Sequence, residues 1–285
     1  MKVLVADKFE QSGLDALKAA GCDVMFEPDA SGDTLVAAIK KSKAPVLVVR
    51  STEVTEAMMD AGALSLIVRA GAGVNTIDVA AASKRGIYVS NCPGKNSVAV
   101  AELTMGLILA LDRRIPDNVA ELRAGTWNKK EYSKAKGLMG QTLGLLGFGH
   151  IGREVAKRAR AFGMPVVVWS RRFNTDEEAR VAAQEEFGVE IVATPAELMA
   201  KSDIVSVHLA LTKETRGFMN AALLKHAKVG AYIVNTARAE VMDYAALAEA
   251  IKAKSIRVGL DVFENEPSSA TATFVDTLCA SPAVF

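Results

Sequence analysis

Short apolar runs alternate with helical patterns along the first third of the chain. Runs of this length are typical of strands, and the segments between them repeat apolar residues at helical spacing. Because strands that are apolar throughout must be covered on both faces, the pattern predicts a parallel sheet between helices. Asp33 is expected to cap the second helix. The expected strands are 2–6, 23–26, 45–49, 64–68 and 87–90, and the expected helices include 13–20 and 78–84.

A second series of the same kind follows Asn91-Cys92-Pro93-Gly94. It opens with a long apolar helix over 97–112, expected to connect two lobes, and its strands begin after Gly140. The fold class is therefore α/β, with two doubly wound parallel-sheet lobes at residues 1–96 and 97–285. The expected strands are 142–146, 165–169, 203–207, 231–234 and 256–260, with helices such as 150–162 and 244–253 between them.

Composition narrows the class of protein. A length of 285 residues agrees with two domains. With 34 basic and 33 acidic residues the chain is nearly neutral, so its charge does not predict binding to nucleic acid. No apolar run approaches the ~18 residues of a membrane helix. The three cysteines are widely spaced, which predicts neither a metal site nor a disulfide framework. With an N-terminus unlike a signal peptide, the sequence favours a cytoplasmic protein without metal, nucleic-acid or membrane partners.

A glycine-rich motif follows the strand expected at 142–146. Gly147-Phe148-Gly149-His150-Ile151-Gly152 has the spacing G-x-G-x-x-G and opens a helix, the context that a dinucleotide site requires. The first glycine permits the turn, the second lets the pyrophosphate approach the backbone, and the third allows close packing of helix and strand. A glycine turn without a ligand is the alternative. We therefore expect Gly147, Gly149, His150, Ile151 and Gly152 to bind a dinucleotide.

The next strand ends in Ser170-Arg171-Arg172. NAD sites usually place an acidic residue there to bind the ribose 2′-hydroxyl. A carboxylate would repel a 2′-phosphate, whereas a serine flanked by guanidinium groups can receive it. The sequence therefore favours NADP over NAD. The alternative is that both arginines belong to a solvated loop surface.

Two polar segments follow later strands and carry candidate chemistry. Arg238 lies in Asn235-Thr236-Ala237-Arg238, after the strand expected at 231–234, and Glu266 lies after the strand expected at 256–260. Open α/β sheets bind ligands at these carboxyl ends. The planar guanidinium of an arginine matches the two oxygens of a carboxylate, and a glutamate can orient a histidine and raise its pKa.

These segments, together with Arg69-Ala70-Gly71-Ala72-Gly73-Val74-Asn75, resemble the D-2-hydroxyacid dehydrogenase family over the whole chain. The resemblance implies a flavodoxin-like substrate lobe, a Rossmann cofactor lobe, and hydride transfer between NAD(P) and a small 2-hydroxy or 2-oxo acid. Arg238 would bind the substrate carboxylate and carbonyl, and Glu266 would pair with a catalytic histidine. Asp261 would hold the nicotinamide carboxamide. The resemblance also implies that His208, Thr236 and Ala237 line the cofactor, and that Ala72, Gly73 and Val74 cradle the substrate carboxylate.

Within the family, the first lobe resembles phosphoglycerate dehydrogenases at 49–52, 69–71 and 91–97. This implies that Arg50 and Arg69 face a substrate phosphate and that Ser51 also binds the substrate, and 3-phosphoglycerate with phosphohydroxypyruvate becomes the expected substrate pair. Salt bridges between the lobes are the alternative role for the arginines. The segment Ser170–Arg172 instead resembles NADPH-using glyoxylate and hydroxypyruvate reductases, which remain an alternative.

The family's catalytic histidine lies in a Pro-His-x-Gly segment, and the printed sequence ends about where that segment is expected to begin. His150, His208 and His226 do not match it, and His226 is expected on a surface helix. A catalytically impaired NAD(P)-binding regulatory protein is therefore an alternative of another class. The resemblance also implies a homodimer through residues 97–130. Ala239 stands where the family usually has glycine, which is tolerated unless φ is positive.

Overall fold

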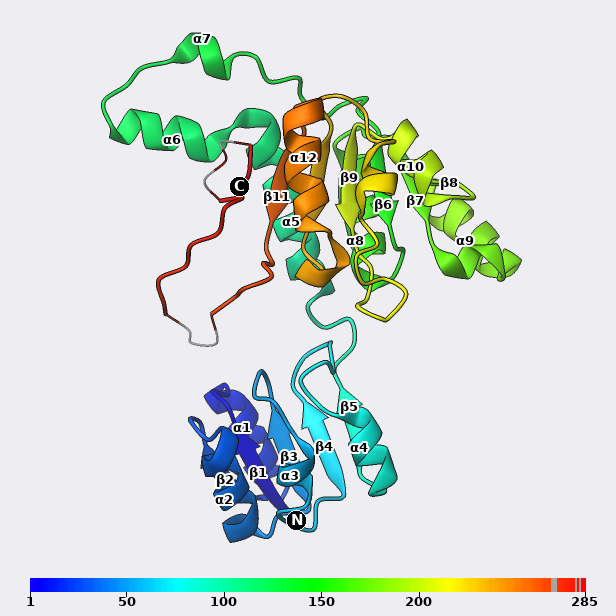
Figure 1. The fold of residues 1–285 in the computed structure, drawn as a ribbon. Helices are drawn as coiled ribbons and strands as arrows, with labels where there is room; N and C mark the ends of the chain where they lie inside the picture. Colours follow the sequence, from blue (N-terminus) through cyan, green and yellow to red (C-terminus); the bar gives the residue numbers. More distant parts are fainter. Residues whose placement is uncertain (268–270, 280, 282) are drawn as a thin grey trace. The chain divides into compact units, whose positions relative to one another are not determined.

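The computed structural model describes residues 1–267, 271–279, 281 and 283–285. The chain divides into two compact units, Met1–Asn96 and Ser97–Phe285 (Figure 1). The N-terminal unit is a parallel sheet in the order β2-β1-β3-β4-β5, which is the flavodoxin-like order. Its strands are β1 (Lys2–Ala6), β2 (Asp23–Glu27), β3 (Val46–Val49), β4 (Leu66–Arg69) and β5 (Tyr88–Asn91), and its helices are α1 (Gln11–Ala19), α2 (Gly32–Ser42), α3 (Glu56–Met59) and α4 (Val79–Lys84).

Alternation of side chains along these strands separates two cores in the N-terminal unit. Leu4 and Leu47 are fully buried in the core that contains residues of α2, α3 and α4. Val3 and Val48 belong to the opposite core, where Leu14 of α1 packs. The sheet is thus covered by helices on both faces, as the apolar strands predict.

The C-terminal unit has six strands in the order β11-β10-β9-β6-β7-β8. Counted from β6, this is the Rossmann order 3-2-1-4-5-6, read from the opposite edge. Its strands are β6 (Leu143–Leu146), β7 (Val166–Trp169), β8 (Glu190–Ile191), β9 (Ile204–Val207), β10 (Tyr232–Asn235) and β11 (Arg257–Leu260). Its helices are α5 (Ser97–Arg113), α6 (Ile115–Arg123), α7 (Lys129–Tyr132), α8 (His150–Ala161), α9 (Glu177–Phe187), α10 (Pro195–Lys201), α11 (Ala221–Leu224) and α12 (Tyr244–Lys254), with 3-10 turns η1 (Arg171–Asn174) and η2 (Ala239–Val241).

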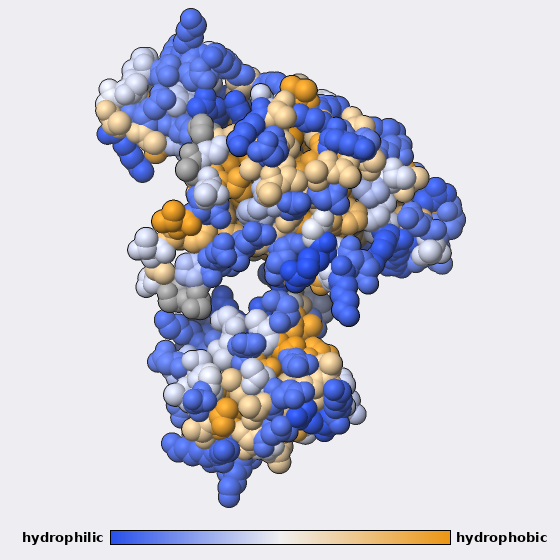
Figure 2. Space-filling model, in the orientation of Figure 1, coloured by the Kyte–Doolittle hydropathy of each residue, from blue (hydrophilic) through white to orange (hydrophobic). Residues whose placement is uncertain are grey.

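The strands of the C-terminal unit are buried on both faces. Leu145 and Val168 pack with residues of α5, α8 and α9 in one core. Leu146 and Val167 belong to the other core, with residues of α10, α11 and α12. This doubly wound arrangement confirms the predicted fold class. On the face that Figure 2 displays, most residues are hydrophilic and apolar residues gather in separate areas.

Several local predictions were wrong. Ser31, and not Asp33, is the N-cap of α2, where its side chain and that of Thr34 form a capping box. His226 lies in the turn after α11 and not on a helix, although it is exposed as expected. Strand β8 was not predicted, because two residues are too short to display a pattern. Along the described residues, the structure contains no helix with the length and apolarity to cross a bilayer.

Candidate functional site

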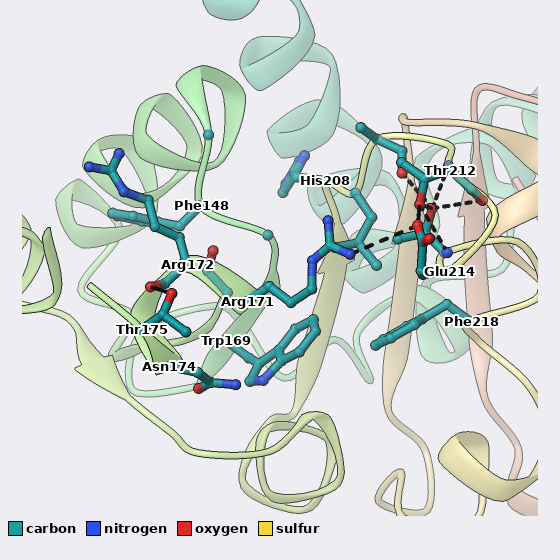
Figure 3. Close-up of a pocket in the computed structure, with 16 residues that line it drawn as sticks. Phe148, Trp169, Arg171, Arg172, Asn174, Thr175, His208, Thr212, Glu214 and Phe218 are labelled. Carbon is teal, nitrogen blue, oxygen red and sulfur yellow. Dashed lines mark hydrogen bonds and ion pairs between the residues drawn. The ribbon is translucent and has the colours of Figure 1, made fainter. Parts of the chain in front are cut away.

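The order of the C-terminal sheet reverses between β6 and β9, and this is where doubly wound sheets bind ligands. A cleft of about 730 Å³ opens there, lined by Gly147 after β6 and by His208 after β9. Figure 3 shows that its other walls come from the ends of β7 and from the segment after β9. The lining residues are Gly147, Phe148, Gly149, Trp169, Ser170, Arg171, Arg172, Asn174, Thr175, His208, Leu209, Ala210, Thr212, Glu214, Thr215 and Phe218.

Each glycine of the motif has a distinct geometric reason. Gly147 has φ +100°, and a Cβ there would lie 2.5 Å from the carbonyl oxygen of His208. A Cβ on Gly152 would lie 2.6 Å from the carbonyl oxygen of Gly147, so only glycine allows α8 to approach β6 this closely. A Cβ on Gly149 would meet open space. Gly149 is thus not required by packing, and it leaves the start of α8 accessible to a phosphate group, which fits a dinucleotide.

Ser170, Arg171 and Arg172 line the same cleft at the end of β7. Both arginine side chains are about two-thirds exposed, and each approaches an acid. The Arg172 Nε atom donates to Asp176 over 2.8 Å, and the Arg171 Nη1 atom lies 3.9 Å from Glu214 Oε2. Such exposed pairs are weak, so these guanidinium groups can rearrange toward an anionic ligand.

Aromatic side chains and a hydroxyl-rich turn form the rest of the wall. Trp169 stacks on Phe218 with ring centroids 5.3 Å apart. The buried indole Nε1 of Trp169 has no hydrogen-bond partner among the described residues. Thr215 fixes the turn after β9, because its hydroxyl accepts from the Thr212 N–H over 2.7 Å and donates to the Ala210 carbonyl. The cleft therefore combines an apolar wall with oriented polar groups, as small-molecule sites do.

His208 lies in this cleft as a neutral group. Burial lowers the pKa of His208 to about 4, and one ring nitrogen lies 2.9 Å from the Ser206 hydroxyl. An imidazole with this pKa is uncharged at neutral pH. The side chain therefore adds no positive charge beside the glycine-rich loop.

Arg238 is held at the carboxyl end of β10 by the fully buried Asn235. The Asn235 amide donates to the Arg238 carbonyl over 2.9 Å and accepts from the Ala237 N–H over 2.9 Å. The Thr236 hydroxyl lies 3.0 Å from that of Thr104 on α5, inside the unit. Ala239 begins η2 with helical backbone, so glycine is not required there. The loop that carries Arg238 is thus held by the Asn235 side chain and by the contact of Thr236 with α5.

Asp261 and Glu266 lie after β11, next to this loop in the sheet. The Asp261 N–H donates to the Asn235 carbonyl over 3.1 Å. Partial burial, and then the neighbouring Glu266 carboxylate, raise the pKa of Asp261. Glu266 is exposed and accepts a hydrogen bond from the Phe263 N–H over 2.8 Å. Arg238, Asp261 and Glu266 come from adjacent strand ends of one unit, but none of them lines the cleft described above.

The N-terminal unit has its own crossover, between β1 and β3, and Asp7 fills it. Its carboxylate accepts hydrogen bonds from the backbone N–H groups of Arg50, Ser51 and Thr52, over 2.7, 3.1 and 3.0 Å. The Ser51 and Thr52 hydroxyls also donate to it. Burial opposes ionisation, but these bonds lower the pKa of Asp7 overall. The Ser51 N–H and hydroxyl, expected at a substrate, are thus engaged with Asp7.

Arg69 ends β4, and its guanidinium lies against Gly71. A Cβ on Gly71 would lie 1.6 Å from the Arg69 Nη1 atom, so a larger residue would displace the guanidinium. The following loop is tied to the end of β5, because the Asn91 amide donates to the Ala72 carbonyl and the Cys92 N–H donates to the Gly71 carbonyl. Gly73 and Val74 continue this half-buried loop.

The structure thus groups some of the expected residues and not others. Gly147, Gly149, Ser170, Arg171, Arg172 and His208 line one cleft, while His150, Ile151 and Gly152 open α8 behind it. Sequence reasoning missed Asp7, Trp169, Glu214 and Phe218. The only available signals were the position of Asp7 directly after a strand and the Thr212-x-x-Thr215 spacing, which is typical of a hydroxyl-stabilised turn.

Comparisons with known proteins agree with this geometry. The family described as D-isomer specific 2-hydroxyacid dehydrogenase, NAD binding domain, matches residues 105–282. D-3-phosphoglycerate dehydrogenase of Methanocaldococcus jannaschii is 41% identical over 94% of this chain and 50% of the relative. Hydroxypyruvate reductase of Thermotoga maritima is 44% identical over 78% of this chain and 70% of the relative. A crystal structure from Thermus thermophilus superposes with a TM-score of 0.84 at 33% identity, covering 100% of this chain and 88% of that one.

The chain spans about half the length of the phosphoglycerate dehydrogenases that it matches. The family match extends over the glycine-framed cleft and over the strand ends that carry Arg238 and Asp261. Residues 105–282 match the family's NAD-binding domain, and this chain therefore belongs to the D-isomer specific 2-hydroxyacid dehydrogenase family.

Proposed function

We propose that the protein transfers hydride reversibly between NAD(P) and C2 of a small D-2-hydroxy acid. The observation that carries this proposal is the glycine-framed cleft at the crossover between β6 and β9, with Arg238 fixed after β10 of the same sheet. Family membership supports it. The unit Met1–Asn96 would bind the substrate, and the unit Ser97–Phe285 would bind the cofactor.

A bound nicotinamide would donate or accept the hydride. Arg238 would bind the substrate carboxylate and polarise the adjacent carbonyl, and Asn235 would keep the guanidinium in place through the loop backbone. Glu266 would orient a histidine that protonates the product alkoxide, a contribution typically worth about 10²–10⁴ in rate. Asp261 would hold the carboxamide. Thr236, Ala237 and His208 would border the cofactor.

For the substrate, we propose 3-phosphoglycerate and phosphohydroxypyruvate. Arg50 follows β3 and Arg69 ends the neighbouring strand β4, and two guanidinium groups suit a phosphate beside the proposed carboxylate-binding loop of Ala72, Gly73 and Val74. The relative from Methanocaldococcus jannaschii is named a D-3-phosphoglycerate dehydrogenase. The second candidate is a hydroxypyruvate or glyoxylate reductase, supported by the name of the Thermotoga maritima relative.

For the cofactor, we propose that NADP is preferred over NAD. Ser170 stands at the end of β7 where a carboxylate would disfavour a 2′-phosphate, and Arg171 and Arg172 line the cleft beside it. Asn174 and Thr175 add polar groups to the same wall. All five side chains follow β7, so they would act on one end of the cofactor.

We also propose a homodimer through residues 97–130. Helix α6 buries none of its residues, although Ile115 and Leu122 are apolar and about half exposed. Val98, Leu103 and Trp127 add further exposed apolar side chains to this segment. A second copy of the chain would cover this surface.

The test is nucleotide binding followed by turnover. Trp127 is 79% exposed and Trp169 lines the cleft, so the Trp127→Phe variant leaves Trp169 as the fluorescent reporter. NADPH is expected to quench its emission at lower concentration than NADH. NADPH oxidation is then followed with phosphohydroxypyruvate and with hydroxypyruvate, on the wild type and on Arg50→Ala.

We expect Arg50→Ala to reduce turnover of the phosphorylated acceptor only. Turnover of hydroxypyruvate that is unaffected by Arg50→Ala, without any preference for the phosphorylated acid, would favour the reductase. Nucleotide binding without turnover of either acid by the full protein would favour the regulatory alternative. Absence of binding to both nucleotides would contradict the proposal as a whole.

A further inference from the structure

Among the described residues that line the cofactor cleft, Glu214 is the only carboxylate. It follows β9, whereas Arg171 follows β7, and Figure 3 shows the two side chains pointing toward each other across the cleft. The Arg171 Nη1 atom lies 3.9 Å from the Glu214 Oε2 atom. Among the described lining residues, the segment after β7 thus supplies no carboxylate, and the segment after β9 supplies one, Glu214.

Glu214 is held in this position as an anion. Its Oε2 atom accepts a hydrogen bond from the Thr212 hydroxyl over 2.7 Å. That bond is the largest cause of a lowered pKa at Glu214, with Arg171 contributing a smaller share. Thr212 is fixed in turn by the Thr215 hydroxyl. The charge is thus anchored on a defined turn and does not depend on Arg171 for its placement.

Two ligands would meet this pair differently. A ribose 2′-hydroxyl can donate a hydrogen bond to a carboxylate, whereas a 2′-phosphate is repelled by it and competes for the same arginine. We propose that Glu214 is a specificity-determining residue that opposes the 2′-phosphate and thereby limits the preference for NADPH over NADH. This inference rests on the proposed binding of nicotinamide dinucleotides at the cleft, and it names the side chain that restrains their discrimination.

The test compares dissociation constants for NADPH and NADH in the wild type and in Glu214→Gln, with Trp169 as the reporter in the Trp127→Phe background. Glutamine keeps the size of the side chain and removes its charge. The ratio of the NADH constant to the NADPH constant is expected to rise about three- to tenfold, mainly because NADPH binds more tightly. The rise should shrink at high salt, because the charges are exposed.

The matched control is Glu177→Gln. Glu177 is equally exposed and pairs with Arg180 on α9, but it does not line the cleft. The net charge of the protein changes by the same amount, so a general electrostatic effect would appear in both variants. The ratio is expected to stay at the wild-type value in the control.

The double variant Arg171→Ala/Glu214→Gln separates competition for the arginine from direct repulsion. The effect of Glu214→Gln is expected to be smaller in the Arg171→Ala background. An unchanged ratio in Glu214→Gln would overturn the inference while the proposed function stands. Weaker NADPH binding in Glu214→Gln would also overturn it, because Glu214 would then hold Arg171 in place for the phosphate. If the wild type bound neither nucleotide, the proposed function would fail and this inference with it.

Discussion

Each of the two sheets has a crossover at which strand order reverses, and the two crossovers differ in what their backbone N–H groups bind. Between β6 and β9, the chain places Gly147 and Gly149, and the space beside Gly149 stays open. Between β1 and β3, the chain places Asp7, whose carboxylate takes up three consecutive backbone N–H groups of residues 50–52. The crossover between β6 and β9 leaves its backbone N–H donors accessible to a ligand. At the crossover between β1 and β3, the backbone N–H groups instead donate to the side chain of Asp7.

This difference shows that strand order alone does not make a binding site. Both sheets have a crossover where ligands bind in doubly wound folds. At the crossover between β1 and β3, the Asp7 carboxylate already occupies the backbone donors of residues 50–52, so these donors are not free to bind a ligand. At the crossover between β6 and β9, the donors belong to the start of α8, which carries no acid in its first turn. Three predictions, at the glycines of the open crossover, at Asp7 and at His208, can break or sharpen this contrast.

The largest effect is expected at the open crossover. Gly147→Ala places a Cβ 2.5 Å from the His208 carbonyl at φ +100°, so the C-terminal unit should lose about 3 kcal/mol of unfolding free energy and its nucleotide binding. Gly149→Ala is the matched control for folding, because its Cβ meets open space. It should keep the stability of the wild type but bind NADPH about tenfold more weakly. Thermal unfolding and fluorescence titration measure both, and equal binding by Gly149→Ala and the wild type would contradict the role of this backbone.

A smaller effect is expected at the filled crossover. Asp7→Ala removes the acceptor of three backbone N–H groups and leaves a non-glycine residue at φ +82°, so the N-terminal unit should lose about 2 kcal/mol in urea unfolding at pH 7. Asp7→Asn retains one acceptor oxygen and tolerates this backbone, so its loss should be smaller. Because the folded pKa of Asp7 lies below 3.8, its contribution is present above that pH and is lost as the pH falls through the folded value. Wild-type stability of Asp7→Ala would show that water satisfies the donors equally well.

The smallest effect at pH 7 is expected at His208, because its contribution appears only as the pH falls. The pKa of His208 falls from 6.5 to about 4 on folding, so protonation favours the unfolded chain. Stability of the C-terminal unit should be complete above pH 6.5 and decrease as the pH falls toward 4, before the Asp7 contribution of the N-terminal unit is lost. His208→Gln should flatten this decrease in urea unfolding between pH 7 and 4. An identical slope in wild type and variant would assign the decrease to other groups.

The sequence predicts the sheets and the glycine motif well because each has a local signal. Strand β6 is a continuous apolar run, and Gly147–Gly152 has fixed spacing, so neither depends on distant contacts. Asp7 could not be predicted in its role, since the groups that it binds lie 43 to 45 residues along the chain. Glu214 was missed for a similar reason, because its partner Arg171 belongs to another strand end. The roles of Arg238 and Glu266 at a substrate remain predictions.

The hydroxyl contact between Thr104 and Thr236 joins positions 132 residues apart in the sequence. It limits which substitutions these two positions can accept during evolution. Thr104 is fully buried and Thr236 is nearly so. An apolar replacement at Thr236 alone leaves the Thr104 hydroxyl with its bond to the Val100 carbonyl only, whereas apolar replacement of both is close to neutral. Descendants of this chain should therefore exchange the two residues together, which makes the pair a covariation signature that ties α5 to the segment bearing Arg238.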